Sequence, residues 1–225
     1  MASETDVLIW IQGNLSGGIM DPLMEFVSYS GDHGAIWLII AVALMIYKPT
    51  REAGVVMAAA VLMGHVLNDW MIKPLVERPR PFIEDLSLLL IIDPPDGYSF
   101  ASGHTVKAFA AASALFIYDR RWGAVLMAYA ALTGFSRTYL MVHYPSDVVA
   151  GAFIGIMCAV TAYAVMEQIK KENYAPALRP GNDVYSLSHS SKSWAMPFLA
   201  MDQLGTPPVR TATLTASRIS SFVAP

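Results

Sequence analysis

Long apolar runs are the feature that most constrains this chain. A helix needs about 20 consecutive apolar residues to cross a bilayer. Glu52–Ile72, Trp122–Val142 and Ser146–Gln168 meet that length, while Gly103–Tyr118 and Gly34–Tyr47 are shorter. Only 15% of the 225 residues are charged, against about 25% in an ordinary soluble domain. The runs predict an all-α integral membrane bundle of five transmembrane helices, or six if the N-terminus inserts more deeply.

The segments around these runs differ in character. Residues 1–33 mix aromatic and aliphatic side chains with Asp and Glu, a pattern typical of helices that lie in the membrane interface. The connection 73–102 is polar and holds five prolines, as functional or disordered loops often do. We therefore expect interfacial N-terminal helices (1–33), a transmembrane domain (34–171) and a mostly disordered cytoplasmic tail (172–225), because the tail is rich in Ser, Thr, Ala and Pro.

The positive charges of the short loops predict the orientation of the bundle. These charges belong to Lys48, Arg51, Arg120, Arg121, Lys170 and Lys171. Five alternating spans place all of them on one side, and the positive-inside rule makes that side cytoplasmic. The connection 73–102 and the loop 139–145 then face outward, in a multi-pass protein of a bacterial-type plasma (inner) membrane. The outer side is periplasmic or extracellular.

Three polar motifs lie at the outward ends of the runs: "KPLVERPRP", "SFASGHT" and "SRTYLMVHYPSD". Charged groups are costly at membrane depth, so their presence there indicates function. A single Lys near a span end usually snorkels to the interface, and a single His at a helix start is usually a capping residue. Three cations, two His and a carboxylate on one face instead describe a phosphate site. The candidate site residues are Lys73, Arg80, Ser102, Gly103, His104, Arg137, His143 and Asp147.

Phosphoryl transfer depends on positioning and on fixed positive charge, because the transferred group carries negative charge on its equatorial oxygens. Lys73, Arg80 and Arg137 can supply that charge, the arginines through a planar fork of donors. Backbone N–H groups near Gly103 add the positive end of a helix. The hydroxyl of Ser102 can donate to the same anion.

Two histidines can supply the chemistry. His143 is the predicted nucleophile, since neutral imidazole attacks phosphorus once its other nitrogen is oriented. Asp147 follows four residues later, after Pro145, which favours a first helical turn. From there Asp147 can accept a hydrogen bond from His143. His104 remains as general acid toward the leaving oxygen and then as general base for water.

The patterns K-x6-RP, SGH and SR-x5-H-x3-D resemble the three signature motifs of the type 2 phosphatidic-acid phosphatase superfamily. That superfamily includes vanadium haloperoxidases and bacterial acid phosphatases. The resemblance covers about Lys73 to Gly151 and implies a metal-independent phosphatase, without a cofactor, that works through a phosphohistidine on His143. The chain departs from the family at Ala101, where Pro is usual; this can loosen the turn but removes no catalytic group. The resemblance also implies phosphate contacts from Lys73, Arg80, Ser102, Gly103 and Arg137.

The motifs do not explain Lys107, which lies one turn after His104 on nearly the same face of the predicted helix. It either snorkels to the interface or contacts a second phosphate or a lipid headgroup. Among the remaining polar residues, Asp69 is expected to pair with Lys73. His65 is expected to be a buried hydrogen-bonding residue.

The sequence therefore predicts a membrane enzyme that removes phosphate from a lipid phosphate or diphosphate at the outer leaflet. Undecaprenyl diphosphate is favoured, because an outward site without a large soluble domain suits recycling of a lipid carrier. Phosphatidate or phosphatidylglycerophosphate is the alternative. A non-catalytic protein that binds lipid phosphate is a different class, and the presence of His143 and His104 argues against it. The expected partners are the substrate and membrane lipids, with no nucleic acid.

Overall fold

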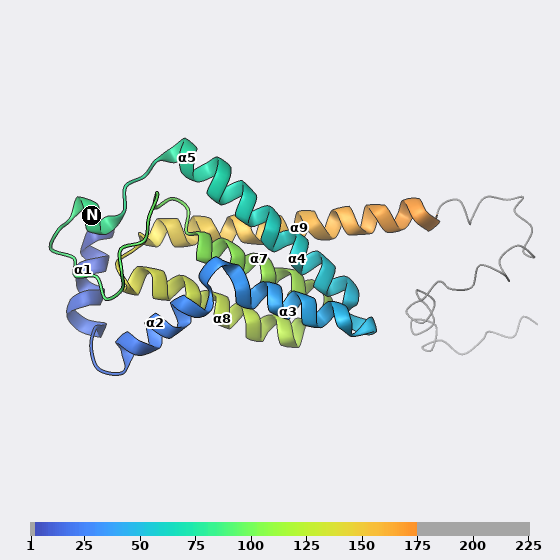
Figure 1. Cartoon of the computed structure of the whole chain (residues 1–225), viewed down its shortest axis with the longest axis horizontal. Helices are drawn as coiled ribbons and strands as arrows, with labels where there is room; N and C mark the ends of the chain where they lie inside the picture. The colour runs from blue at the N-terminus through green and yellow to red at the C-terminus, as the bar shows by residue number, and fades with distance from the viewer. Residues whose placement is uncertain (1–2, 175–225) are drawn as a thin grey trace, which may run out of the picture. The chain divides into compact units, whose positions relative to one another are not determined.

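A computed structural model describes residues 3–174, and within them the chain forms only helices and connecting loops (Figure 1). In chain order the elements are α1 (Glu4–Leu15), α2 (Met20–Ser30), η1 (Asp32–Gly34), α3 (Ala35–Ile46), η2 (Lys48–Thr50), α4 (Arg51–His65), η3 (Val66–Ile72), α5 (Lys73–Val76), α6 (Pro81–Glu84), α7 (Gly103–Tyr118), α8 (Arg120–Tyr139) and α9 (Pro145–Tyr174). Each apolar run corresponds to a long helix, so the predicted all-α class is confirmed for the described residues.

Two helical stretches are long and apolar enough to cross a membrane, Lys48–Glu84 and Pro145–Asn173. The pair α2 and α3, bent by 54°, is a third candidate if it counts as one broken span. Helix α7 has only 16 residues, which is short for a span. The count of five spans therefore stays a prediction. Helix α9 continues to Tyr174, beyond the predicted boundary at residue 171, and the rest of the predicted tail lies outside the described residues.

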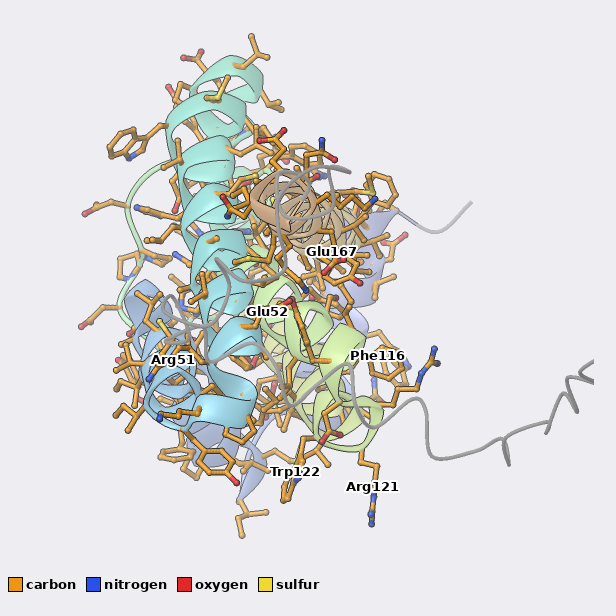
Figure 2. All side chains as sticks on the ribbon, turned by 90° about the vertical axis from the view of Figure 1, so that its right-hand side faces the viewer. Arg51, Glu52, Phe116, Arg121, Trp122 and Glu167 are labelled. Carbon is orange, nitrogen blue, oxygen red and sulfur yellow. The ribbon has the colours of Figure 1, made fainter. Side chains whose placement is uncertain are left out.

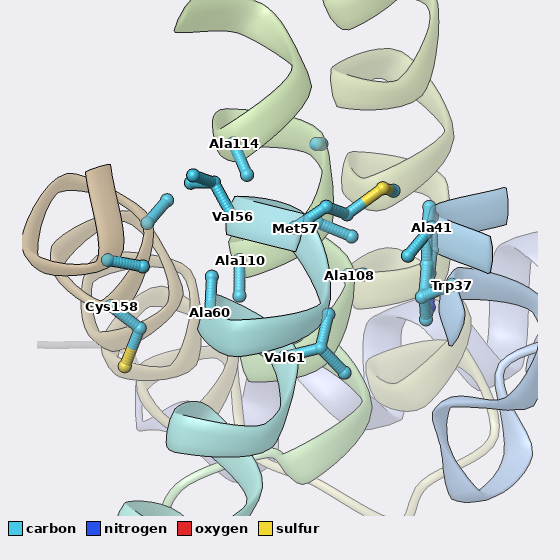
Figure 3. Packing of buried hydrophobic residues seen from close by; sticks show 14 of the residues in the cluster. Trp37, Ala41, Val56, Met57, Ala60, Val61, Ala108, Ala110, Ala114 and Cys158 are labelled. Carbon is cyan, nitrogen blue, oxygen red and sulfur yellow. The ribbon is translucent and has the colours of Figure 1, made fainter. Parts of the chain in front are cut away.

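Helix α7 is the central helix of the bundle. It packs against α4, α8 and α9, and 11 of its 16 residues are buried. Most of the buried side chains are Ala, Ser or Gly, and small side chains let neighbouring membrane helices approach closely. Figure 3 shows the packing around Val56, Met57, Ala60, Ala108, Ala110, Ala114 and Cys158. The apolar core is therefore an alanine-rich contact between α7 and its neighbours.

Two glycines on α9 set its distance from α7. A Cβ at Gly155 would lie 2.4 Å from the carbonyl oxygen of Val106, and one at Gly151 would lie 2.9 Å from that of Ser102. Their spacing of four residues puts both on one helix face, as in the close helix contacts of membrane proteins. At the start of both helices, the N–H of Ser102 donates to the carbonyl of Asp147 at 3.1 Å. The contact thus brings two of the three predicted motifs together.

The short-loop cations gather at the opposite end of the bundle. There the hydroxyl of Tyr118 donates to Glu52, and Nζ of Lys170 lies 2.9 Å from the same carboxylate. The ends of α4, α7 and α9 therefore meet. Figure 2 views this end and shows Arg51 and Arg121 on it. The side of the membrane that this end faces stays a prediction.

The N-terminal segment, which we define as α1, α2 and η1, packs on the loop between α8 and α9. Leu8 and Ile11 of α1 and Met24 of α2 are buried in one apolar cluster with residues 139–142. The hydroxyl of Tyr139 also donates to Asp21. The predicted N-terminal helices are present, and they are joined to the loop that carries His143. Their position in the membrane interface remains a prediction.

Candidate active site

Arg80 is a buried arginine beside His143. Its Nη1 lies 3.4 Å from Nε2 of His143 and donates to the carbonyl of Val142 at 3.0 Å. Its Nε and Nη2 donate to the carbonyls of Gly97 and Asp96, each at 2.9 Å. The proline-rich connection therefore wraps around the guanidinium group and fixes its orientation toward the imidazole.

Arg137, in the last turn of α8, is a second buried arginine near His143. Its Nη1 donates to the hydroxyl of Ser28 in α2, and its Nε has no hydrogen-bond partner among the described residues. Its charge interacts with those of His143 and Arg80. Within residues 3–174, no carboxylate lies within 4.0 Å of either buried guanidinium group. The carboxylates that act on them, Asp147 and Asp96 on Arg80 and Asp32 on Arg137, lie farther away than an ion-pair contact, so a bound anion would stabilise this buried pair.

Arg78 lies in the same motif as Arg80 but is neutralised by protein groups. Its Nη1 lies 2.7 Å from Oδ1 of Asp147, and its Nη2 lies 2.6 Å from Oε2 of Glu4. Neither Arg78 nor Glu4 was among the residues predicted for the site. A second arginine two positions before Arg80 was the available signal, but the acidic partner comes from α1, 74 positions away. Arg78 therefore joins α1 to the start of α9.

His143 and Asp147 lie side by side in the loop before α9 and in its first turn. Nδ1 of His143 is 3.6 Å from Oδ2 of Asp147 and 3.4 Å from Oγ of Ser99. Ser99 donates to the same carboxylate oxygen at 2.5 Å, and the N–H of Tyr144 donates to it at 2.9 Å. The predicted partners are adjacent, but they share the oxygen with Ser99, which the sequence analysis missed.

The surroundings of His143 favour its neutral form. Burial holds the pKa of His143 below its ordinary value of 6.5, and the positive charges of Arg137 and Arg80 act in the same direction, against the effect of Asp147. Neutral imidazole is the nucleophilic form. Since Nδ1 faces Ser99 and Asp147, Nε2 beside Arg80 is the nitrogen available to attack phosphorus.

His104 lies in the first turn of α7. Its Nε2 is 2.7 Å from Oδ1 of Asp32 in η1, a partner that the sequence analysis did not predict. Its Nδ1 makes no hydrogen bond within the described residues. The first N–H groups of α7, beginning at Gly103, form the positive end of the helix at this place. His104 also interacts electrostatically with Arg137 and Lys107.

Asp69 joins two lysines near the start of α7. Nζ of Lys73 lies 2.8 Å from Oδ1 of Asp69, which confirms the predicted pair, and Nζ of Lys107 lies 3.6 Å from Oδ2. Lys107 is only 7% exposed. A Cβ at Gly34 would lie 3.0 Å from its Cδ, and one at Gly103 would lie 3.0 Å from Oδ1 of Asp69. Lys107 is therefore held inside the protein beside Asp69, and its contact with a second phosphate stays a prediction.

The π-helical turn η3 presents Asp69 to this cluster. Buried Asn68 donates to Oδ1 of Asp69 and to the carbonyl of Ala101, both at 3.1 Å. Nδ1 of His65 lies 2.6 Å from Oδ2 of Asp69, and the side chain of His65 is 43% exposed. His65 thus forms the expected kind of polar contact but is not buried, because it lies one turn outside the cluster. Turns of this type occur frequently at functional sites.

These groups can bind and transfer a phosphoryl group. The neutral imidazole of His143, a second imidazole and two buried guanidinium groups lie at one end of the bundle. Within residues 3–174, no group of three or more His, Cys, Asp or Glu side chains could hold a metal ion. The imidazole of His143 and the two buried guanidinium groups suit attack by a nitrogen on phosphorus, assisted by fixed positive charge.

Comparison with known proteins agrees with this arrangement. The model of the PAP2 superfamily matches residues 49–171. The chain belongs to the PAP2 superfamily. All eight candidate residues of this PAP2 protein lie inside the matched range, whereas the N-terminal segment lies outside it.

Individual relatives include an undecaprenyl-diphosphatase from Sulfolobus acidocaldarius, 31% identical over 137 residues, which cover 60% of this chain and 66% of that protein. A lipid A 4'-phosphatase from Bacteroides thetaiotaomicron is 32% identical over 166 residues, which cover 68% of this chain and 72% of that protein. Among solved structures, Aquifex aeolicus LpxE is similar with a TM-score of 0.65 and 29% identity, covering 73% of this chain and 96% of that one. The PAP2 protein thus shares its fold with a membrane-protein family.

Proposed function

We propose that this PAP2 protein is a membrane-embedded phosphatase that hydrolyses a lipid diphosphate or lipid phosphate through a phosphohistidine on His143. The observation that carries the proposal is the pair of buried guanidinium groups beside His143, Arg80 and Arg137. Neither forms an ion pair with a carboxylate within 4.0 Å among the described residues, although Asp147 and Asp96 act on Arg80, and Asp32 on Arg137, from farther away. A phosphate group bound between them would supply negative charge in direct contact with both and bring phosphorus to Nε2 of His143.

The first step forms the phosphoenzyme. Nε2 of His143 attacks phosphorus, the bond to the leaving oxygen breaks, and His104 gives that oxygen a proton. Arg80 and Arg137 stabilise the charge on the equatorial oxygens. The motif assigns further phosphate contacts to Lys73, Ser102 and Gly103.

The second step releases phosphate. His104, now neutral, takes a proton from water while the water oxygen attacks phosphorus. The phosphorus–nitrogen bond breaks, and its electron pair returns to the imidazole of His143. Asp147 and Ser99 hold Nδ1 of His143 throughout, so the ring keeps its orientation.

We propose undecaprenyl diphosphate as the first candidate substrate, supported by the similarity to the Sulfolobus undecaprenyl-diphosphatase. A lipid phosphomonoester such as phosphatidate or phosphatidylglycerophosphate is the second, and the similarity to a lipid A 4'-phosphatase favours a monoester. The second phosphate of a diphosphate would meet Lys107. Together with Lys73 and Asp69, this lysine makes a cluster of net positive charge one turn from His104.

We also propose that the site faces the outer side of the membrane, because the short-loop cations lie at the other end of the bundle. In a Cys158→Ser background, a cysteine near Asp93 should react with an impermeant thiol reagent in intact cells. A cysteine near Arg120 should react only after permeabilisation. The reverse pattern would place the site on the cytoplasmic side.

The function is tested by release of inorganic phosphate from purified protein in EDTA. The panel is undecaprenyl diphosphate, phosphatidate and phosphatidylglycerophosphate, and the proposal expects release from at least one of them. His143→Gln serves as the matched control, since it removes the nucleophile and keeps a polar side chain of similar size. Binding of all three lipids without any release would instead identify a non-catalytic lipid-phosphate-binding protein.

A further inference from the structure

The acid–base histidine has a carboxylate partner from outside the family match. Nε2 of His104 lies 2.7 Å from Oδ1 of Asp32, and the two side chains are 18% and 41% exposed. Asp32 belongs to η1, whereas the PAP2 match begins at residue 49. The three motifs therefore do not account for this contact. It comes from a segment that the sequence placed in the membrane interface.

The turn that carries Asp32 fits closely against α7. A Cβ at Gly31 would lie 3.2 Å from Cδ2 of His104, and one at Gly34 would lie 3.0 Å from Cδ of Lys107. Gly34 also has a φ of +75°, which L side chains rarely adopt. Because His104 and Lys107 are about one turn apart, the backbone of η1 follows one face of α7. This fit holds the carboxylate of Asp32 at the imidazole.

The contact also determines which nitrogen of His104 can act on the substrate. Nε2 is engaged by Asp32, and Nδ1 makes no hydrogen bond among the described residues. An imidazolium paired through Nε2 can release its proton from Nδ1. The neutral ring that remains keeps its proton on Nε2, so Nδ1 is then a base. An aspartate in this position orients the ring and fixes its tautomer.

We propose that Asp32 is a positioning residue for His104: it holds Nε2, so that Nδ1 gives a proton to the leaving oxygen and then takes one from water. The N-terminal segment thereby completes the active site and is more than a membrane anchor. The inference rests on the proposed function, since it takes His104 as the acid and base of a phosphatase.

The decisive measurement compares leaving groups. An alkoxide leaves a lipid phosphomonoester only with a proton, whereas the p-nitrophenolate ion is a stable anion and needs little help. Asp32→Asn should lower kcat/KM for phosphatidate by roughly 30-fold. This loss is smaller than the roughly 10²–10⁴-fold that a general acid contributes, because His104 itself is still present. For p-nitrophenyl phosphate in the same detergent, kcat/KM should change by less than about threefold, because formation of the phosphoenzyme does not then need the acid.

Asp21→Asn is the matched control. Asp21 lies in the same N-terminal segment, but its carboxylate contacts Tyr139 and the N–H of Gly17. Its replacement should leave the ratio of the two kcat/KM values unchanged. Asp32→Glu should restore part of the rate on phosphatidate. In a His104→Gln background, Asp32→Asn should cause no further loss, because the two residues act as one unit.

Three results would overturn the inference: wild-type rates with Asp32→Asn on both substrates, an equal loss on both, or an added loss in the His104→Gln background. The second and third would show that Asp32 only supports the fold. Failure of the proposed function looks different, since the wild-type protein itself would then release no phosphate from any lipid.

Discussion

The two histidine–aspartate pairs of the site are built in opposite ways. His143 and Asp147 are four positions apart and both almost fully buried, and Ser99 and Tyr144 also donate to the carboxylate. His104 and Asp32 are 72 positions apart, and Asp32 is 41% exposed. His143, the proposed nucleophile, is thus fixed by the core of the protein, whereas His104, the proposed acid and base, is contacted by a carboxylate from a separate segment. This difference matches their proposed tasks, because the nucleophile acts on every phosphate, whereas the need for the acid in forming the phosphoenzyme depends on the leaving group.

The largest expected effects come from replacing each histidine in turn, because the two variants should stop different steps of the reaction. His143→Gln should lower phosphate release by roughly 10⁶-fold for every substrate, the scale found when an enzyme loses its nucleophile. His104→Gln should retain phosphorylation by p-nitrophenyl phosphate but lose attack by water, so the phosphoenzyme should accumulate. The reaction is quenched with alkali, because a phosphohistidine is labile in acid and stable in base, and the peptide that holds residue 143 is then analysed by mass spectrometry. A phosphorylated protein in the His143→Gln variant would show that the assignment is wrong.

Asp147→Asn should have the next largest effect, a loss of kcat of about 10²–10³-fold, comparable to removal of one preorganised electrostatic contact. The loss should be the same for alkyl and aryl phosphates, in contrast to Asp32→Asn, because the nucleophile takes part in every reaction. A dependence on the leaving group would remove the distinction between the two pairs.

The pH profile gives a second measure of the same variant. Because the pKa of His143 is lowered from 6.5, the acid limb of kcat/KM should lie below that pH in the wild-type protein. Asp147 opposes the lowering, so Asp147→Asn should move the limb to still lower pH. An acid limb that moves upward in Asp147→Asn would contradict the proposed role of the carboxylate.

The distance between partners along the chain explains which contacts of the site could be predicted from the sequence. The helices follow from the length of the apolar runs, and the nearness of His143 and Asp147 follows from their spacing at a helix start. Contacts between distant segments have no such local rule. Ser99 lies 44 positions from His143 in a connection without periodicity, and Asp32 lies in the short polar loop before α3. The available signal for Asp32 was topological, since five alternating spans put the residues before the first span on the same side as the connection 73–102.

Lys107 shows a second limit of the sequence. Its position one helical turn from His104 was visible, but its burial depends on Gly34, which leaves room for the lysine stem. A glycine beside a buried lysine gives no periodic pattern in the sequence. The sequence alone therefore could not show whether Lys107 snorkels to the interface or lies inside the protein. In the structure the lysine lies inside the protein, near Asp69.

A smaller effect is expected for Lys107→Met, which tests the part of the site near His104, the proposed acid. The second phosphate of a diphosphate would remain on this side as the leaving group. The variant should therefore lower kcat/KM for undecaprenyl diphosphate by about 30-fold and that for phosphatidate by less than about threefold, since a hydrogen bond to a charged group contributes roughly 1.5–3 kcal/mol. Equal losses on both lipids would show that Lys107 does not distinguish a diphosphate from a monoester.

The smallest effect is expected for Ser99→Ala, which tests how firmly the His143–Asp147 pair is held in place. Ser99 donates to Oδ2 of Asp147 and lies 3.4 Å from Nδ1 of His143, so its hydroxyl contacts both members of the pair. Its removal takes away one of several donors to a buried carboxylate, because Arg78 and Tyr144 remain. The expected loss is about tenfold, equal for alkyl and aryl phosphates, in line with one hydrogen bond to a charged group. If Ser99→Ala instead raised kcat, Ser99 would be competing with His143 for Asp147, and the 3.6 Å separation of the pair would close once the hydroxyl is gone. That result would show that the His143–Asp147 pair is not rigidly fixed in this structure. The proposed contrast with the His104–Asp32 pair would then be wrong.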